Sequence, residues 1–391
     1  MIVILIFTII FFAYGLFEQI NHFKKINKIP IRIHVNGTRG KSTTTRLIAA
    51  GLRESGLKVL AKTTGTLPRL ILEDGTEIPV KRKSAANIKE QMKILSLAAQ
   101  KKVDALVLEC MAVNPENQWI SENKMIKSTI GVITNVREDH LEEMGTNLEQ
   151  IADTLKLTMP NNGTLVTAEN VYLSTFQEEA NLLNTKLIKV NPNSISNEIM
   201  EKFNYMNFKE NVSIALKVNQ LIGVKKNIAL KGMLKAKPDP GALKIYKFSH
   251  HNKSIFFVNA FAANDKNSIL LIWKKIKKKF NINTIPFIGV INSREDRILR
   301  SIQLSHLLAK EIILFKLFLV GTSSHFTRKA LLKSKVPINK ITNIEKISDP
   351  EKVLKKVFDS FKREAIIIGF GNTKGMGQKL IDYFNDNGEE V

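Results

Sequence analysis

Residues 31–45, IRIHVNGTRGKSTTT, place a glycine-rich loop between an apolar strand and a helix. In that order, the backbone N–H groups of the loop and of the first helical turn converge on a phosphate group. We expect Lys41 to reach the β- and γ-phosphates of a nucleotide and the Ser42 hydroxyl to bind Mg²⁺. Val35 stands where the full phosphate-loop pattern has its first glycine, so a chance Gly-Lys-Ser turn is the alternative. The predicted cofactor-binding residues of this segment are Gly37, Thr38, Arg39, Gly40, Lys41, Ser42 and Thr43.

Apolar runs and helical patterns alternate along the rest of the chain. This alternation predicts an α/β fold in which helices cover both faces of a parallel sheet. The expected strands span residues 31–35, 58–61, 103–108, 130–134 and 164–166, and then 254–258, 285–291, 312–320 and 365–368; the expected helices of the first half span residues 42–54, 86–101 and 147–158. Residues 235–242, KAKPDPGA, are the best internal boundary because they hold two prolines and a glycine. We therefore expect a nucleotide-binding domain over residues 30–242 and a Rossmann-like domain over residues 250–391.

Two polar groups follow predicted strands of the first half. Glu109 ends the apolar run at residues 103–108, and the carboxyl ends of parallel strands line the ligand crevice, so we expect Glu109 to hold Mg²⁺. His140, in TNVREDHLEEMG at residues 134–145, reaches the same edge and is a second expected metal ligand. A strand-end acid in water and an ordinary surface histidine are the alternatives. Lys41, Glu109 and His140 are the expected catalytic residues.

In the second half, Arg294, Asp296 and Arg297 follow the apolar run at residues 287–291. Guanidinium groups at a crevice edge can bind carboxylates through two parallel hydrogen bonds. We expect these residues to contact an acidic substrate. A solvated ion-pair cluster is the alternative.

The first 17 residues carry no charged side chain and form a helix of about 25 Å, against a hydrocarbon core of about 30 Å. Lys24, Lys25 and Lys28 follow this stretch. Because basic residues favour the cytoplasmic side of a membrane span, we expect the rest of the chain to lie in the cytoplasm. We expect residues 1–20 to be a retained single-pass membrane anchor. A cleaved signal peptide is the alternative, although no basic residue precedes the apolar run.

The net charge indicates the classes of partner, and the cysteine content indicates the compartment. Lys and Arg number 59 against 36 Asp and Glu, and the net charge of +23 favours an anionic membrane surface or a polyanionic substrate. A merely solvated basic surface is the alternative. The lysine cluster at residues 274–279 lacks interleaved aromatics, so we expect no nucleic-acid partner. The single cysteine, Cys110, excludes an intramolecular disulfide and favours a reducing compartment.

The motifs together resemble a known family. GTRGKST at 37–43, Glu109 and TNVREDHLEEMG at 134–145 resemble the Mur ligase superfamily, which includes the peptidoglycan Mur ligases and the folylpolyglutamate synthases. Five further stretches are similar to the ligase subunits of poly-γ-glutamate synthases, the PgsB/CapB family: ECMAVNPE at 109–116, PDPGALKIY at 238–246, VNAFAANDKNS at 258–268, NSREDR at 292–297 and GFGNTKGMG at 369–377. The resemblance covers essentially the whole chain.

The resemblance implies an ATP- and Mg²⁺-dependent amide ligase that polymerises glutamate through an acyl phosphate at the cytoplasmic face of the membrane. It implies glutamate, the growing polyglutamate chain and membrane subunits of a synthesis and export complex as partners. Carried over by position, Ser42 and Glu109 hold a first Mg²⁺, and His140 helps to hold a second. Asn211, in FKENVSIAL, and Asn264, in AFAAND, are the remaining implied nucleotide contacts.

Some positions depart from the pattern of the superfamily. Gly241-Ala242 stands where Mur ligases have Gly-Arg, so no arginine reaches phosphate from there. Lys156 lies sixteen residues after His140 and could match a carbamylated lysine of Mur ligases, although an ordinary helical lysine is the default. Two alternatives stay open: a ligase like folylpolyglutamate synthase that acts on a soluble acceptor, and a membrane-associated ATPase that forms no amide.

Overall fold

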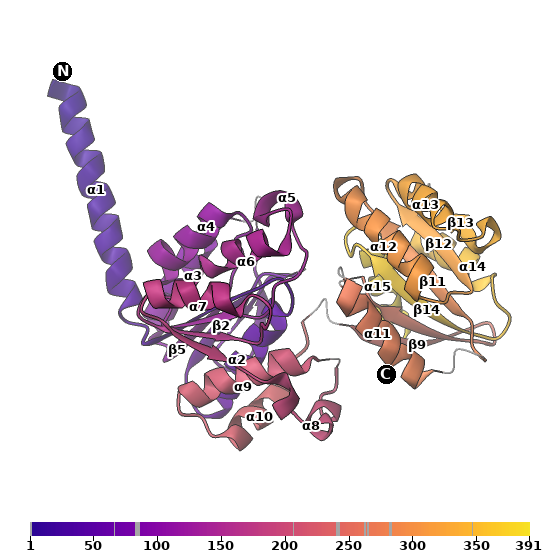
Figure 1. Cartoon of the computed structure of the whole chain (residues 1–391), viewed down its shortest axis with the longest axis horizontal. Coiled ribbons are helices and arrows are strands. Elements are labelled where there is room, and N and C mark those ends of the chain that lie inside the picture. The colour runs from indigo at the N-terminus through magenta and orange to yellow at the C-terminus, as the bar shows by residue number, and fades with distance from the viewer. Residues whose placement is uncertain are drawn as a thin grey trace. The chain divides into compact units, whose positions relative to one another are not determined.

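The computed structural model describes residues 2–65, 67–82, 87–205, 207–239, 243–261, 263, 266–280, 284–345 and 347–391. The chain forms two compact units, Met1–Asp239 and Pro240–Val391, and each has a sheet of its own (Figure 1). The division falls inside the segment 235–242 that the prolines and glycine mark in the sequence.

The sheet of the first unit has the strand order β4-β3-β2-β5-β1-β6-β7-β8. Its strands are β1 (Ile31–Asn36), β2 (Val59–Thr63), β3 (Arg69–Ile71), β4 (Glu77–Pro79), β5 (Ala105–Glu109), β6 (Ile130–Ile133), β7 (Thr164–Thr167) and β8 (Lys186–Lys189). In this order, the strands β2, β5, β1, β6, β7 and β8 pair in parallel, as predicted. The strands β3 and β4 pair antiparallel beside β2 and form one edge of the sheet. The physical reason is the short connections around β3, because a few residues can reverse the chain but cannot hold the crossover helix that a parallel pair needs.

Helices cover both faces of this sheet. The helices of the first unit are α1 (Ile2–Ile26), which projects from it, α2 (Lys41–Glu54), α3 (Glu90–Lys101), α4 (Pro115–Ile120), the π-helical η1 (Ser121–Ile126), α5 (Leu141–Met144), α6 (Leu148–Lys156), α7 (Leu173–Leu182), the 3₁₀ turn η2 (Pro192–Ser194), α8 (Asn197–Glu201), α9 (Lys209–Leu221) and α10 (Lys226–Lys235). One core cluster packs α2, α9 and α10 against one face (Figure 1). Two others pack α3 with η1, and α6 with α7, against the opposite face.

The alternation of side chains along β1 and β5 decides what faces α2. In β5, Ala105 and Val107 belong to the core on the α2 side, so the two-residue period places Glu109 on that side as well. In β1, Ile33 and Val35 face α2, whereas His34 bonds Glu122 in η1 on the other side.

The long helix α1 projects from the first unit (Figure 1). It is long and apolar enough to cross a membrane, and none of its most apolar window is buried in the unit. Near its C-terminal end, His22 and Ile26 are buried against the unit.

The second unit has the strand order β13-β12-β11-β14-β10-β9-β15. Its elements are β9 (Lys244–His250), β10 (Lys253–Asn259), α11 (Lys266–Lys279), β11 (Phe287–Ser293), η3 (Glu295–Arg297), α12 (Ile298–Glu311), β12 (Lys316–Gly321), α13 (Ser324–Lys333), η4 (Ile338–Lys340), β13 (Ile341–Asn343), α14 (Pro350–Phe358), β14 (Glu364–Gly371), α15 (Met376–Asn387) and β15 (Glu389–Glu390). The strands from β13 to β10 are parallel, and β9 and β15 pair antiparallel at one edge. The predicted strand at residues 312–320 begins only at Lys316, because Ile312 still caps α12.

Candidate functional site

The glycine-rich loop joins β1 to α2 through two residues with positive φ, Gly37 at 121° and Gly40 at 84°. A Cβ atom on Gly37 would lie 2.0 Å from Thr134 Oγ1 and 2.7 Å from its backbone nitrogen. A Cβ atom on Gly40 would lie 2.3 Å from Asn211 Oδ1. Both positions therefore require glycine, for conformation and for space.

The loop is held in shape by Thr134 and Asn135, which follow β6. Thr38 N donates to Asn135 O at 3.1 Å, and Asn135 Nδ2 donates to Arg39 O at 3.0 Å. Thr134 Oγ1 donates to the same Arg39 carbonyl at 2.7 Å. These bonds hold the loop in its shape. Thr134 and Asn135 were not among the site residues expected from the sequence, although both stand at a strand end beside the predicted histidine.

Lys41 begins α2 and folds back over the loop. Its ammonium donates to Gly37 O at 2.6 Å and reaches Thr38 O at 3.4 Å. A cation so placed, together with the N-terminus of α2, gives the loop the positive potential that a phosphate group needs. Ser42 and Thr43 lie in the same first turn and are half-buried.

Glu109 faces the first turn of α2, as the strand period requires. Its Oε2 accepts hydrogen bonds from Ser42 Oγ at 2.8 Å and from Thr64 N at 2.7 Å. The residue is only 2% exposed, and burial raises the pKa of its carboxyl group, while the nearby Lys41 ammonium lowers it. A buried carboxylate in such a place is stabilised by any further cation.

The oxygen atoms around Gly65 suit a hard divalent cation. A Cβ atom on Gly65 would lie 2.9 Å from Ser42 Oγ and 3.6 Å from Asp239 Oδ1, so both groups surround the same point. Asp239 also raises the pKa of the Glu109 carboxyl. Within the described ranges, no three His, Cys, Asp or Glu side chains form a metal-binding group.

His140 lies at the start of α5 with a φ of 47°. Its Nε2 is 4.0 Å from Asp139 Oδ2, and Asp139 Oδ1 is 3.2 Å from Arg39 Nη2. Asp139 thus connects the histidine to the phosphate loop. The structure brings Ser42 and Glu109 into direct contact, whereas His140 approaches the loop through Asp139 and Arg39.

Of the two asparagines predicted near the nucleotide, the structure describes one, Asn211. Asn211 is 3% exposed in α9, and its side chain lies against Gly40 of the loop. Asn264 lies outside the described residues, as do Gly241 and Ala242.

Lys156 forms ion pairs in α6, at 2.9 Å from Asp153 Oδ1 and 3.9 Å from Glu179 Oε2. A hydrogen bond to Asp153 raises the pKa of Lys156. This environment favours the ammonium form, whereas carbamylation requires the neutral amine.

Lys62 is a buried cation that was not among the site residues expected from the sequence. It is 0% exposed in β2, and its Nζ lies 3.0 Å from Glu90 Oε2 and 3.5 Å from Met111 Sδ. Burial lowers its pKa, and Glu90 raises it. The signal was a lysine directly after the apolar residues of VLAKT.

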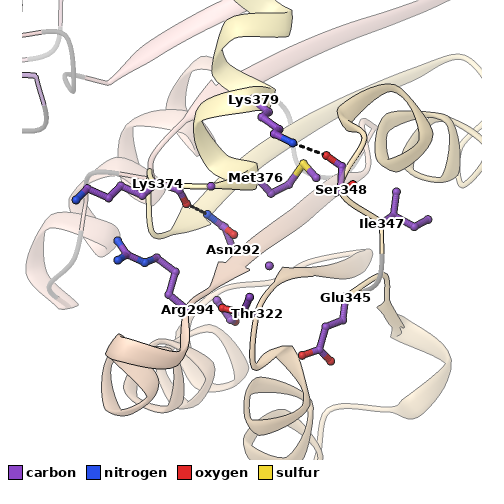
Figure 2. Close-up of a pocket in the computed structure, with 12 residues that line it drawn as sticks. Asn292, Arg294, Thr322, Glu345, Ile347, Ser348, Lys374, Met376 and Lys379 are labelled. Atoms are coloured by element: carbon purple, nitrogen blue, oxygen red, sulfur yellow. Dashed lines mark hydrogen bonds between the residues drawn. The ribbon is translucent and has the colours of Figure 1, made fainter.

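The second unit contains a pocket of about 480 Å³ at the carboxyl ends of β11, β12 and β14 (Figure 2). Three cationic side chains, Arg294, Lys374 and Lys379, line it together with Glu345 and Thr322. Lys379 donates to Ser348 O at 2.7 Å. The basic lining suits an anionic ligand.

The three predicted substrate residues have different positions. Arg294 lines the pocket, and its Nη2 donates to Asp296 Oδ2 at 2.7 Å. Asp296 is 52% exposed, and Arg297 caps the start of α12. Lys374 and Lys379 complete the basic lining and come from the glycine-rich connection and the helix after β14. The sequence did not reveal this grouping because both residues are far from Arg294 along the chain.

Comparisons with known proteins agree with this architecture. Residues 35–237 match the Mur ligase middle domain, and residues 245–387 match the poly-gamma-glutamate synthase CapB C-terminal domain. The chain is 40% identical to the capsule biosynthesis protein CapB of Bacillus anthracis over 96% of this chain and 81% of that protein. It is 38% identical to the PGA synthase CapB of Bacillus subtilis over 95% of this chain and 94% of that protein.

Among solved structures, the fold is similar to a bifunctional folylpolyglutamate synthase/dihydrofolate synthase of Yersinia pestis, complexed with AMPPNP and Mn ion. The TM-score is 0.69 at 15% identity, with 94% of this chain and 92% of that chain covered. The loop, the Ser42–Glu109 contact and these matches lead to one assignment: the chain belongs to the CapB family of poly-γ-glutamate synthases, which are ATP-dependent amide ligases of the Mur type.

Proposed function

We propose that this protein polymerises glutamate into poly-γ-glutamate through an acyl-phosphate intermediate, on the cytoplasmic side of a membrane. The observation that carries the chemistry is the contact of Ser42 with the buried Glu109 beside the phosphate loop. This pair supplies oxygen ligands at the point where the γ-phosphate of a nucleotide on that loop would lie. The basic pocket of the second unit supplies a place for an acidic substrate.

The reaction has two steps. An oxygen of the substrate γ-carboxylate attacks the γ-phosphorus of ATP, and ADP leaves. The amine of the next glutamate then attacks the acyl carbon, the amide bond forms, and inorganic phosphate leaves with the electron pair of the broken C–O bond. The amine loses a proton to solvent.

The protein contributes position and charge to these steps. The loop amides and the Lys41 ammonium orient the γ-phosphate and stabilise its charge. Thr134 and Asn135 keep the loop in shape, so little reorganisation accompanies binding. Mg²⁺ held by Ser42 and Glu109 would neutralise phosphate charge, and we include His140 as a second metal contact.

Arg294, Lys374 and Lys379 provide the charge that a glutamate carboxylate requires. Three cations also suit a substrate that keeps a free α-carboxylate on every residue. We propose that this pocket binds the acidic substrate. Asn211 lies against the loop, and we propose that it supports the nucleotide from there.

We propose that α1 is a retained membrane anchor and that the enzyme works with membrane subunits that export the polymer. The apolar stretch of α1 is exposed, and lysines follow it. The positive-inside tendency then places both units in the cytoplasm.

An isotope-transfer experiment tests the acyl phosphate. Substrate carrying heavy oxygen in its γ-carboxylate is incubated with ATP, Mg²⁺ and membranes that contain the protein and its neighbouring subunits. The proposal predicts one heavy oxygen in each phosphate released, and predicts none with Lys41→Ala. Amide formation with unlabelled phosphate would contradict the intermediate, and phosphate release without amide would contradict the ligase assignment.

A further inference from the structure

The base of α1 is packed into the first unit rather than linked to it by a flexible segment. His22 Nε2 bonds Met125 O at 2.8 Å, and Lys25 Nζ donates to Ser96 Oγ at 3.2 Å. Ile26 is 2% exposed, and Lys127 Nζ lies 4.3 Å from the centre of the Phe23 ring. α1 is a single continuous helix from Ile2 to Ile26. The part that enters the membrane therefore fixes the orientation of the unit.

The distances along α1 place this base at the membrane surface. Residues 2–17 form about 24 Å of helix at ~1.5 Å per residue, and Phe17 to His22 adds roughly 7.5 Å. The hydrocarbon core is ~30 Å thick, and each headgroup layer adds about 5–8 Å. The apolar stretch is thus slightly short, and a short span draws the segment after it towards the bilayer. His22 and the surface around it come to lie at the headgroups.

That surface is basic and carries an exposed tryptophan. Trp119, at the end of α4, is 42% exposed, and Lys124 Nζ lies 5.2 Å from the centre of its ring. Six exposed lysines surround the base of α1, and together with Trp119 they form what we call the basal face: Lys24, Lys25, Lys28, Lys93, Lys124 and Lys127. The elements that carry the basal face also hold Glu18, Glu90, Glu116 and Glu122. Of these, Glu122 is buried and Glu90 pairs with Lys62, so positive charge dominates the exposed surface.

We infer that the basal face binds the anionic phospholipid headgroups of the bilayer that holds α1, with Trp119 inserted at the membrane interface. The inference rests on the proposed anchoring by α1. Tryptophan is favoured at the headgroup level because its ring is amphipathic, and lysines near a membrane bind anionic lipid. The contact holds the first unit close to the membrane in one orientation. The phosphate loop then works at a fixed height above the bilayer.

The fluorescence of Trp119 tests this inference in the full chain. Trp273 is the other tryptophan, 5% exposed in the second unit, and Trp273→Phe leaves Trp119 as the single reporter. The protein is reconstituted in vesicles of phosphatidylglycerol with phosphatidylcholine, or of phosphatidylcholine alone. Some of the lipid is brominated near the headgroup. If Trp273→Phe does not fold, the difference between the native chain and Trp119→Phe gives the same signal.

We expect Trp119 to emit at shorter wavelength and to be quenched by brominated lipid when phosphatidylglycerol is present. The matched control carries Trp119→Phe, Trp273→Phe and Leu221→Trp. Leu221 is 38% exposed at the end of α9, on the opposite face of the sheet, and a tryptophan there should not be quenched.

Charge reversal tests the role of the lysines. Lys93→Glu with Lys124→Glu should weaken the docking of Trp119 by at least roughly fivefold for each position, because a lysine near an anionic surface is worth ~1 kcal/mol and a glutamate in its place adds repulsion. Lys225→Glu with Lys226→Glu changes the net charge equally at exposed sites on the opposite face, and should leave the quenching unchanged. High salt should reproduce the loss.

Flotation with the vesicles shows separately whether α1 anchors the protein. Chains that float while Trp119 stays unquenched would overturn the inference and leave the anchor intact. Equal quenching at positions 119 and 221, or quenching that needs the neighbouring membrane subunits, would also overturn it, and the second result would indicate a protein contact. Chains that do not float would contradict the anchor on which the inference rests. Amide formation is measured in parallel in membranes that also carry the neighbouring subunits, so a failed ligase assignment is detected independently.

Discussion

Ser42 Oγ donates a 2.8 Å hydrogen bond to Glu109 Oε2 and so joins the first turn of α2 to the end of β5. The contact brings together two residues that are far apart in the sequence and that both carry oxygen ligands. We predict that Glu109→Gln lowers the rate of amide formation by about 10²- to 10³-fold, because removing one preorganised electrostatic contact typically costs that much. The Mg²⁺ concentration for half-maximal rate should also rise.

Glu116→Gln is the matched control, since Glu116 is an exposed glutamate in α4. Rates are measured across an Mg²⁺ titration, and thermal unfolding confirms that each variant is folded. An unchanged rate and Mg²⁺ dependence in Glu109→Gln would remove Glu109 from the metal site.

The phosphate loop should tolerate no side chain at Gly37. Gly37 and Gly223 both have positive φ, but a Cβ atom at Gly37 would overlap Thr134, whereas nothing lies within 4 Å at Gly223. Gly37→Ala should therefore abolish nucleotide binding, while Gly223→Ala should cost only backbone strain of about 1 kcal/mol. Titration with a labelled ATP analogue measures the nucleotide affinity of both variants. Equal affinities in the two variants would show that the close approach to Thr134 is unimportant.

The pocket in the second unit should control the affinity for the acidic substrate. Arg294 lines it, and losing a hydrogen bond to a charged group costs about 1.5–3 kcal/mol, or roughly 10- to 100-fold in KM for glutamate. Arg294→Ala should raise that KM and leave the KM for ATP unchanged. Arg297→Ala, at the cap of α12, should have a smaller effect. A larger effect at Arg297 would mean that the substrate lies outside the pocket.

The buried pair of His34 and Glu122 should make stability depend on pH. Burial opposes the charged imidazolium, but Cys110 and Glu122 more than offset this and raise the pKa of His34 to about 10, from 6.5 in the unfolded chain. Because the folded pKa is the higher one, the stabilisation is complete below pH 6.5 and is lost as the pH rises towards 10.

His34→Gln should remove that dependence and lower the free energy of unfolding by about 3–5 kcal/mol at neutral pH, because Glu122 loses its buried partner. The melting temperature of the full chain in detergent, measured between pH 6 and pH 10, gives both quantities. His306→Gln, at an exposed position in α12, is the control. A wild-type melting temperature that does not fall over this range would contradict a protonated His34.

Lys156 should act as an ordinary ammonium group. Its ion pair with Asp153 persists in Lys156→Arg, which cannot be carbamylated. We predict that this variant keeps its activity and that neither enzyme depends on dissolved carbon dioxide. An inactive Lys156→Arg variant, rescued in Lys156→Ala by a small carboxylic acid, would instead indicate carbamylation.

The local parts of the site were predictable from the sequence. The phosphate loop is contiguous, and its strand, glycines and helix each leave a pattern that does not depend on tertiary structure. The position of Glu109 was predictable because the carboxyl end of a parallel strand lies at the sheet edge.

The remaining contacts depend on residues that are distant in sequence. Asn135 holds the loop from the segment that follows β6, and Asp239 approaches Ser42 from the end of the first unit. Their side chains have no pattern of their own. The short strands β3 and β4 were missed because three residues carry too little periodicity. The strand β9 was also missed, although its polar and apolar side chains partly alternate.

The central claim is that ATP bound at Lys41 drives formation of a γ-linked glutamate polymer. The most direct measurement is the product made from labelled L- or D-glutamate, ATP and Mg²⁺ by membranes that carry this protein and its neighbouring subunits. We predict a polymer that resists ordinary α-peptidases, requires ATP and is absent in Lys41→Ala. Turnover of ATP without any amide product, with folded protein and all subunits present, would contradict the account.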